Sequence, residues 1–153
     1  MMKNYKRDAI PGILIGVIAT MMILMPALRV TNPNQSYNGL QIVFGHEFLN
    51  WGNVVSAQIE FSALNLIAYG LPILASLSLL LSKQGYLFSS ILFSFGAILL
   101  YFIPSFTTVT TTLFDNVTPL NINWHFGSGL IIALVLSIIG AISSLLLTIL
   151  NRD

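Results

Sequence analysis

The chain has 153 residues, of which 56% are hydrophobic and only 7% are charged. Soluble domains carry roughly 25% charged residues, so this composition excludes an ordinary soluble globular protein. The net charge of +1 is too small for a nucleic-acid-binding protein, and the absence of cysteine excludes disulfides and thiolate metal sites. The length fits one domain. The composition therefore predicts a small integral membrane protein that occupies residues 1–153 as a single unit.

Four apolar blocks follow one another along the chain, each close to the length that a membrane-spanning helix requires. We expect spans at about residues 10–28, 61–82, 86–103 and 126–150. The two longer connections, at about residues 29–60 and 104–125, then lie on the same side of the bilayer. The fold class expected is an all-α membrane protein: a four-helix transmembrane bundle with a small extracytoplasmic β-hairpin or sheet.

The first block also follows basic residues, as the apolar part of a signal peptide does. It is too long for a typical signal peptide, and the sequence Met25-Pro26-Ala27-Leu28 lacks the small residues that a signal peptidase requires. We therefore expect this block to remain as a membrane span.

The basic residues flank the predicted spans unevenly. Only Lys83, Gln84 and Gly85 separate the second and third spans, which predicts a tight antiparallel hairpin. Arg29 is the only basic residue on the side of the long connections. The other basic residues lie on the opposite side: Lys3, Lys6, Arg7, Lys83 and Arg152. Because positively charged loops stay in the cytoplasm, we expect a multi-pass protein of the cell membrane with both termini cytoplasmic.

Rows of small residues on the first and fourth spans predict close helix packing, because small side chains let backbones approach within a bilayer. The first span carries Gly12, Gly16 and Thr20. The fourth span carries one row of Gly129, Ala133, Ser137 and Ala141, and a second of Gly140, Ser144 and Thr148. These rows fit packing within one chain, and alternatively a contact between copies in a homo-oligomer.

The third span separates into two predicted faces. A bulky row is expected to face lipid or a neighbouring helix: Phe88, Leu92, Phe95, Leu99 and Phe102. A smaller row is expected to pack inward: Ser90, Ser94, Ala97 and Tyr101.

The second span has a polar side, which includes Asn65, Tyr69, Pro72 and Ser76. Pro72 removes a backbone donor and is expected to kink the helix. The polar side either holds neighbouring helices together or lines a pathway.

The long connections have strand-like composition. The run Gly39 to Gly45 is β-branched and bounded by glycines, which predicts a strand. Residues 55–60 alternate between apolar and polar side chains, the pattern of a half-buried strand. A turn is expected at residues 50–53. Residues 107–114 are rich in β-forming residues, so a strand from the second connection could join the hairpin of the first.

This layout of four spans, a long strand-bearing first outer loop and a shorter second one resembles the claudin-like tetraspan architecture. The size and composition are also similar to those of many short four-span proteins of bacteria. Claudin first loops carry a Gly-Leu-Trp motif followed by two cysteines, whereas Gln41 follows Gly39 and Leu40 here and the chain has no cysteine. The resemblance therefore implies an architecture and no functional residue.

Few residues are candidates for polar contacts: Glu60, Asn65, Tyr69 and His125. Glu60 lies near the start of the second span, where it is expected to cap the helix or remain solvated, or alternatively to contact a ligand. No charged residue falls inside a predicted span. His46, Glu47, Asp115 and His125 come from three separate places in the chain and match no metal-binding spacing. We therefore predict no catalytic, cofactor-binding or metal-binding residues.

These observations favour a non-enzymatic membrane protein that acts as an interaction or accessory component. Its expected partners are the lipid bilayer and a protein that binds the outer loops. The alternative is a small transporter or channel for a neutral solute, lined by the polar side of the second span. An intramembrane enzyme is not favoured, because Ser90 and similar hydroxyls have no matched base in the bilayer.

Overall fold

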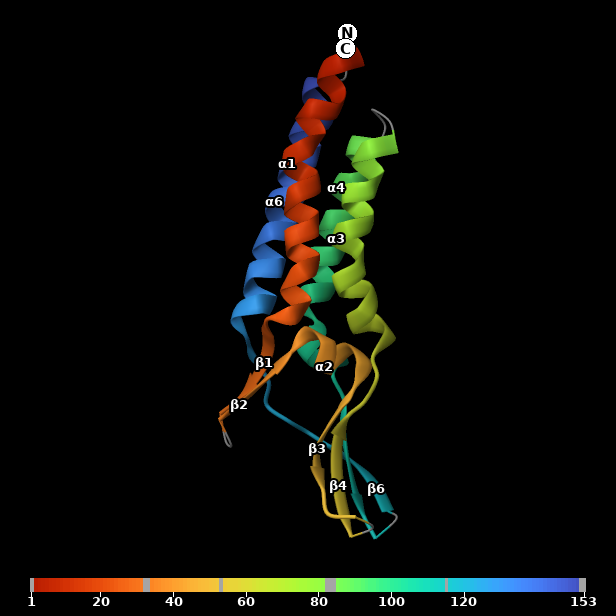
Figure 1. The fold of residues 1–153 in the computed structure, drawn as a ribbon, viewed down its shortest axis with the longest axis vertical. Helices are drawn as coiled ribbons and strands as arrows, with labels where there is room; N and C mark the ends of the chain where they lie inside the picture. The colour runs from red at the N-terminus through yellow and green to blue at the C-terminus, as the bar shows by residue number, and fades with distance from the viewer. Residues whose placement is uncertain (1, 32–33, 53, 82–84, 115, 152–153) are drawn as a thin grey trace.

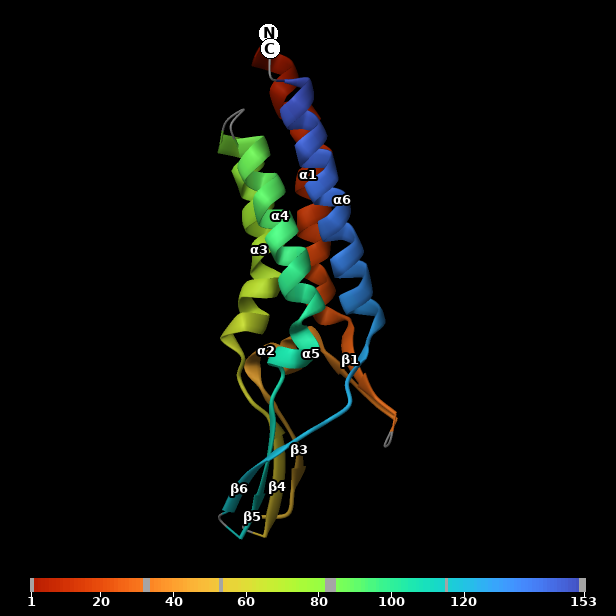
Figure 2. The ribbon, with the colours of Figure 1, turned by 180° about the vertical axis from the view of Figure 1, so that it is seen from behind.

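The computed structural model describes residues 2–31, 34–52, 54–81, 85–114 and 116–151. Four long helices pack side by side into one bundle, as Figures 1 and 2 show from opposite sides. They are α1 (Met2–Met21), α3 (Ala63–Leu81), α4 (Gly85–Tyr101) and α6 (Ser128–Leu150). The two chain termini lie together at one end of the bundle, and all the strands lie at the other end (Figure 1). We call the described residues between α1 and α3 and between α4 and α6 the β region.

Helices α1, α3 and α6 are each long and apolar enough to cross a membrane, and α4 is a shorter apolar helix. The outer surface of the bundle carries large exposed apolar side chains, which on α6 include Ile131, Val135, Ile138 and Ile142. Water would be an unfavourable solvent for such a continuous surface, whereas bilayer hydrocarbon is a favourable one. The helices therefore suggest a multi-pass membrane protein.

The first helix ends earlier than the sequence predicts. After α1, a short 3₁₀ helix, η1 (Met22–Leu24), is followed directly by a strand, β1 (Pro26–Val30), so the predicted span of 10–28 is wrong at its end. The reason is Pro26, which disfavours the helical conformation at the residue before it and has no N–H to donate. Met25 is accordingly extended, with φ −92° and ψ 162°.

The other predicted spans also shift at their ends. α3 begins at Ala63 and α6 at Ser128, about two residues later than expected. The third span does not continue to residue 103: α4 ends at Tyr101, and a separate short helix, α5 (Ile103–Phe106), begins with Pro104 in its first turn. α3 and α4 lie side by side as a helical hairpin, as predicted. The turn expected at Lys83 and Gln84 lies outside the described residues.

The small-residue rows pack within this single chain. A Cβ atom on Gly16 of α1 would collide with the Ser76 side chain and the Pro72 carbonyl of α3. A Cβ atom on Gly140 of α6 would lie 2.9 Å from the Phe93 ring of α4. Close backbone approach is what such rows provide in membrane helices. The predicted packing of these rows within one chain is confirmed.

Polar contacts complete the α4–α6 interface. The hydroxyls of Ser89 and Ser144 lie 3.2 Å apart, and the Ser90 hydroxyl donates to the carbonyl of Ala141 at 3.0 Å. All three serines are buried. Hydroxyl bonds between helices are favourable here because the surroundings offer few other partners.

The faces of α4 differ in part from the prediction. Phe88, Phe95 and Phe102 are exposed on the bundle surface, as expected. Ser94 and Tyr101 were expected to face inward, but both are exposed. The buried face is wider and centres on Phe93 instead, because α4 packs against α3 on one side and α6 on the other.

Two antiparallel sheets form the β region. The first has the order β2-β1-β7, with β2 at Gln35–Asn38 and β7 at His125–Phe126. The second has the order β3-β4-β5-β6, with β3 at His46–Asn50, β4 at Val55–Ile59, β5 at Val109–Leu113 and β6 at Asn116–Leu120. The predicted strand at residues 55–60 and its pairing with a strand from the second connection are confirmed by β4 and β5. The hairpin partner of β4 within the first connection is β3, at His46–Asn50, and not the strand predicted at residues 39–45. The first sheet, in which β1 pairs with β2 and β7, was not expected.

One predicted strand is a helix. Residues Gly39–Phe44 form α2 rather than a strand, so the strand prediction for this run is wrong. The reason is a reciprocal capping box: the backbone N–H of Gln41 donates to the Asn38 side chain, and the backbone N–H of Asn38 donates to the Gln41 side chain, both at 2.9 Å. Ile42 and Val43 are buried on the inner face of this short helix.

The β region and the bundle share one hydrophobic core. Its buried members come from both parts, and include Leu28 of β1, Ile42 of α2, Ile59 of β4, Tyr69 of α3 and Leu130 of α6. Burial of apolar surface across this junction holds the sheets against the helix ends. The strands therefore stand in a definite position relative to the bundle.

Candidate functional site

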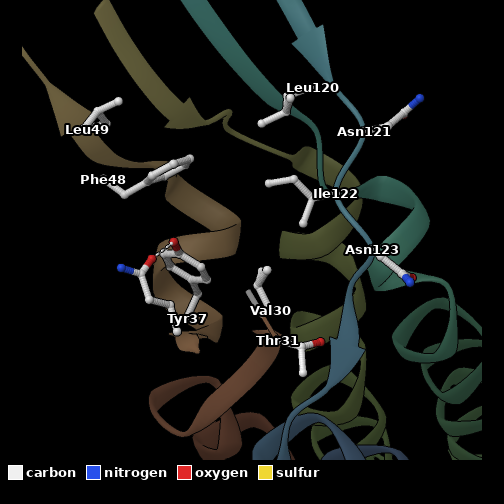
Figure 3. Close-up of a pocket in the computed structure, with 10 residues that line it drawn as sticks. Val30, Thr31, Tyr37, Phe48, Leu49, Leu120, Asn121, Ile122 and Asn123 are labelled. Carbon is white, nitrogen blue, oxygen red and sulfur yellow. Dashed lines mark hydrogen bonds between the residues drawn. The ribbon is translucent and has the colours of Figure 1, made fainter. Parts of the chain in front are cut away.

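A cavity of about 600 Å³ opens between the two sheets (Figure 3). We call it the intersheet cleft. Its volume lies within the range of about 300 to 1,000 Å³ that is typical of small-molecule pockets. The residues that line it are Val30, Thr31, Gln35, Tyr37, Phe48, Leu49, Leu120, Asn121, Ile122 and Asn123.

Four separate segments supply the cleft walls. The end of β1 and strand β2 form one side, and β3 forms another. The third side is the end of β6 and the segment after it, which crosses from β6 back toward β7 and α6 (Figure 2). In Figure 3 the side chains of Phe48, Leu120 and Ile122 point into the space between these segments. The side chains of Asn121 and Asn123 point away from it, so the interior is mainly apolar.

A β-bulge explains how two successive residues of β3 reach the cleft. Glu47 pairs with Gln58 and Leu49 pairs with Ala57, so Phe48 is an extra residue in β3. In a regular strand, successive side chains point to opposite faces. A bulge re-aims a side chain and is often found beside binding sites. Phe48 and Leu49 can therefore both line the cleft.

Tyr37 forms the centre of an aromatic cluster at the cleft wall. Its ring centroid lies 5.9 Å from that of Phe48, 6.1 Å from that of His46 and 5.8 Å from that of Trp124, with the last pair edge to face. Its hydroxyl donates to the Gln35 side-chain oxygen at 2.8 Å. Burial raises the pKa of the Tyr37 hydroxyl above the usual value for tyrosine. The hydroxyl therefore stays protonated and neutral at physiological pH.

The described residues that line the cleft carry no charge. Its ten lining residues contain aliphatic and aromatic side chains, amides, one threonine and one tyrosine, and none of them is acidic or basic. It also has no histidine or serine that could pair as base and nucleophile. Among the residues that the structure describes, no three His, Asp or Glu side chains lie together where they could hold a metal ion. The arrangement is suited to binding an uncharged group rather than to acid–base chemistry.

Glu60 and His125 lie apart from the cleft lining. Glu60 follows β4; its backbone N–H donates to the Thr108 carbonyl at 3.0 Å, and its exposed carboxylate accepts from the Thr108 hydroxyl at 3.2 Å. Ser62, not Glu60, accepts a hydrogen bond from the first turn of α3, at 3.3 Å from the Asn65 nitrogen. The β4–β5 pairing therefore continues as far as Glu60. His125 is exposed in β7, opposite Arg29 of β1.

Asn65 and Tyr69 are both buried on the same face of α3, as predicted. The Asn65 side-chain amide donates to the Ile42 carbonyl at 3.1 Å and to the Thr107 hydroxyl at 3.0 Å. These bonds connect α3 to α2 and to the residue after α5. The four predicted polar residues therefore do not form one site. Asn65 and Tyr69 are buried in the bundle, whereas Glu60 and His125 lie on the surface.

The cleft residues themselves were not identified from the sequence. Tyr37, Phe48 and Ile122 belong to no recognisable motif and come from segments far apart in the chain. The only signal was the length of the two connections, because helical bundles usually need only about 2 to 8 residues between helices. That length indicated a structured region without indicating which side chains would meet.

A second cavity, of about 540 Å³, lies on the outside of the bundle between α4 and α6. Its lining is almost wholly apolar and includes Ala97, Ile98, Tyr101 and Ile138. It belongs to the apolar surface of the helices rather than to the β region.

Comparisons with protein-family models, curated proteins and solved structures found no match to this chain. The layout resemblance to claudin-like proteins therefore stays a prediction.

Proposed function

We propose that this chain is an integral membrane protein whose four long helices cross the bilayer. The apolar bundle surface supports this placement. α4 has 17 residues, which at a rise of about 1.5 Å per residue span about 26 Å, close to the hydrocarbon thickness of about 30 Å. The adjoining α5 and a modest tilt of the longer helices can accommodate the difference.

The proposed orientation places both termini in the cytoplasm and the β region outside. The termini lie at the same end of the bundle, opposite the strands. Arg7 lies within α1, toward the terminal end of the bundle, whereas Arg29 lies in β1 on the strand side. Most of the basic residues in the sequence belong to the side of the bundle where the termini lie. The positive-inside rule assigns that side to the cytoplasm.

Within this topology, the protein acts as a non-enzymatic interaction component that binds a partner through the intersheet cleft. The observation that carries the proposal is the cleft itself: a concave, mostly apolar space on a region joined to the bundle by a common core. Rigid, concave and largely apolar sites are those that bind ligands with the least loss of entropy. Its uncharged lining supports binding and offers no acid–base pair.

The test is affinity purification of the tagged full-length protein in mild detergent. Leu49 and Leu120 are exposed and line the cleft, so Leu49→Trp and Leu120→Trp should fill it without disturbing the buried core. The control is Val117→Trp, an exposed position of β6 outside the cleft lining. We expect both cleft variants to lose co-purifying molecules that the parent and the control retain. The same molecules in all four samples would exclude the cleft as the binding site.

A transporter for a neutral solute is the second candidate, and one observation favours it. Among the described residues of the bundle, three buried polar atoms have no hydrogen-bond partner: Thr20 Oγ1, Asn65 Oδ1 and the Tyr69 hydroxyl. The other polar atoms on this side of α3 are used for packing, since Ser76 donates to the Pro72 and Ile13 carbonyls at 3.0 and 3.3 Å. Solute uptake into proteoliposomes decides between the candidates. Equal flux through the parent and the Asn65→Leu variant would exclude a solute pathway along this side of α3.

A further inference from the structure

We infer that Ser36, Arg29 and His125 together bind the phosphate group of an anionic membrane phospholipid. We call these three residues the donor row. The inference rests on the proposed function only in that the helices cross a bilayer, and it does not depend on the intersheet cleft. The donor row lies on the face of the first sheet that is turned away from the cleft.

The register of this sheet brings the three side chains together. Arg29 of β1 pairs directly with Ser36 of β2 on one side and with His125 of β7 on the other. Directly opposed side chains lie on the same face of a sheet, with Cβ atoms about 4.5 to 5.5 Å apart. All three residues are exposed. The neighbours of Arg29 along β1 point to the opposite face, where Leu28 is buried and Val30 lines the cleft.

No acidic side chain of this sheet neutralises Arg29. Strands β1, β2 and β7 contain no aspartate or glutamate. The two acidic residues in the described part of the β region belong elsewhere: Glu47 lies in β3, and the Glu60 carboxylate accepts from Thr108. Arg29 is also the only lysine or arginine in residues 22–62 and 102–127. The donor row therefore presents a positive charge that has no counterion within its own sheet.

The donor row lies close to the level at which the helices end. The Phe126 ring of β7 packs against the ring of Tyr101, the last residue of α4, with centroids 5.9 Å apart. His125 is one residue further from the bundle and pairs with Arg29, so the row lies about 3.3 Å beyond Phe126 along the strands. Headgroups occupy about 5 to 7 Å on each side of the hydrocarbon. With α4 in the bilayer, the donor row is therefore within the headgroup layer.

Phosphate is the anion that this combination of donors fits. The planar guanidinium of Arg29 can donate two parallel hydrogen bonds to a phosphate. The Ser36 hydroxyl and a His125 imidazole N–H, on either side of it, can each add one donor. Phospholipids bring phosphate groups to this depth of the membrane. An anionic phospholipid is favoured over a zwitterionic one, because the ammonium group of the latter would stand near the Arg29 charge.

The experiment is photolabelling of the full-length protein in nanodiscs that contain phosphatidylcholine and phosphatidylglycerol. The probe is a phosphatidylglycerol analogue with a diazirine in its headgroup, and labelled peptides are mapped by mass spectrometry. We expect label on residues 26–38 and 121–126 of the parent. Arg29→Gln should lower this label about fivefold, the effect of one basic residue at an anionic membrane surface. Ser36→Ala should lower it about twofold, the effect of one hydrogen bond.

Three controls accompany these variants. Arg29→Lys keeps the charge but loses the planar fork, so its label should lie between those of the parent and Arg29→Gln. Gln58→Ala, which is exposed in β4 of the other sheet, should leave the label unchanged. Label at the terminal end of the bundle, where Arg7 lies, should be equal in every sample and shows that the protein is in the bilayer.

The outcomes separate the inference from the proposed function. Sheet label that is equal in the parent and Arg29→Gln would overturn the inference, because the lipid would then lie near the sheet without binding to the row. Equal label in the parent, Arg29→Lys and Ser36→Ala would also overturn it, since charge alone would explain the contact. In both cases label at the terminal end would leave the membrane placement standing. A protein that takes no label at either end would contradict that placement instead.

A competition arm tests whether the phosphate belongs to a lipid. Excess unlabelled phosphatidylglycerol should remove the sheet label, whereas glycerol 3-phosphate at the same concentration should not, because the acyl chains concentrate the lipid at this level. Equal competition by the soluble ester would show that the donor row takes free phosphate compounds and would contradict a lipid ligand.

Discussion

Gly16 and Gly70 show how differently two glycines can contribute to the same bundle. Gly16 lets α1 approach α3 until its Cα faces the Ser76 side chain and the Pro72 carbonyl. Gly70 lies within α3 and has nothing within 4 Å of the position that a Cβ atom would take. The first glycine is required by packing, whereas the second only lowers the stability of its helix.

A matched pair of substitutions tests this difference. Gly16→Ala should lower the free energy of unfolding by about 1 to 3 kcal/mol, because the new methyl group overlaps backbone as well as a side chain. Gly70→Ala should be neutral or stabilising by up to about 1 kcal/mol. Thermal unfolding of both variants in one mild detergent measures the effect. A melting temperature for Gly16→Ala equal to that of Gly70→Ala would show that α1 and α3 do not approach as described.

Thr107 and Thr108 form a second matched pair at neighbouring positions. The buried Thr107 hydroxyl accepts from Asn65 and donates to the Ile103 carbonyl at 2.9 Å, whereas the exposed Thr108 hydroxyl donates to Glu60. Thr107→Val should destabilise the protein by about 1 to 3 kcal/mol, since it leaves a buried donor and a buried acceptor without that partner. Thr108→Val should change stability by less than about 0.5 kcal/mol. Denaturant unfolding followed by tryptophan fluorescence distinguishes them, and equal losses would contradict the buried role of Asn65.

At the scale of elements, local patterns predicted some segments correctly and others not. The alternation in residues 55–59 identified β4, in which Ala57 and Ile59 are buried and Gln58 is exposed. The run after Asn38 has strand-like composition, yet it forms α2 because the capping box supplies the hydrogen bonds of a first helical turn. The spacing of Asn38 and Gln41 was visible in the sequence and could have indicated this helix.

Other elements depend on contacts that no local pattern reveals. Residues 26–28 of β1 were assigned to the first span, but Ala27 and Leu28 are buried in a sheet between β2 and β7. β7 contains only His125 and Phe126, and it pairs with β1 almost a hundred residues earlier in the chain. Pairing over such a separation is set by tertiary packing, and propensity alone cannot predict it.

The capping box of α2 gives a prediction at this scale. Asn38→Ala should cost about 1 kcal/mol, because the first turn of α2 loses its side-chain acceptor. Asn38→Asp keeps that acceptor and should retain most of the stability. Amide hydrogen exchange of residues 39–44 measures local opening of the helix. Unchanged exchange in Asn38→Ala would mean that packing of Ile42 and Val43, rather than the cap, holds α2 in place.

At the scale of the whole molecule, composition and the apolar blocks predicted the helical plan, while the cleft could only be found in three dimensions. The cleft draws residues from the end of β1, from β2, from a bulge in β3 and from the segment after β6. Each segment is ordinary in sequence, and its position depends on how the two sheets pack above the helices. Asn65 and Tyr69 were recognised as a polar side of one helix, but the partners of Asn65 in α2 and after α5 were not predictable.

We expect the helices to cross a membrane and to present the β region outside the cell. The chain has no cysteine, so single-cysteine variants can be labelled with a membrane-impermeant maleimide without background. We predict that Asn121→Cys, at the cleft, is labelled in intact cells, and that Asp8→Cys, near the start of α1, is labelled only after permeabilisation. Val135→Cys, exposed in the middle of α6, should resist labelling in both cases because lipid covers it. Labelling of Asp8→Cys but not Asn121→Cys in intact cells would invert the orientation, and ready labelling of Val135→Cys would contradict the membrane-spanning bundle.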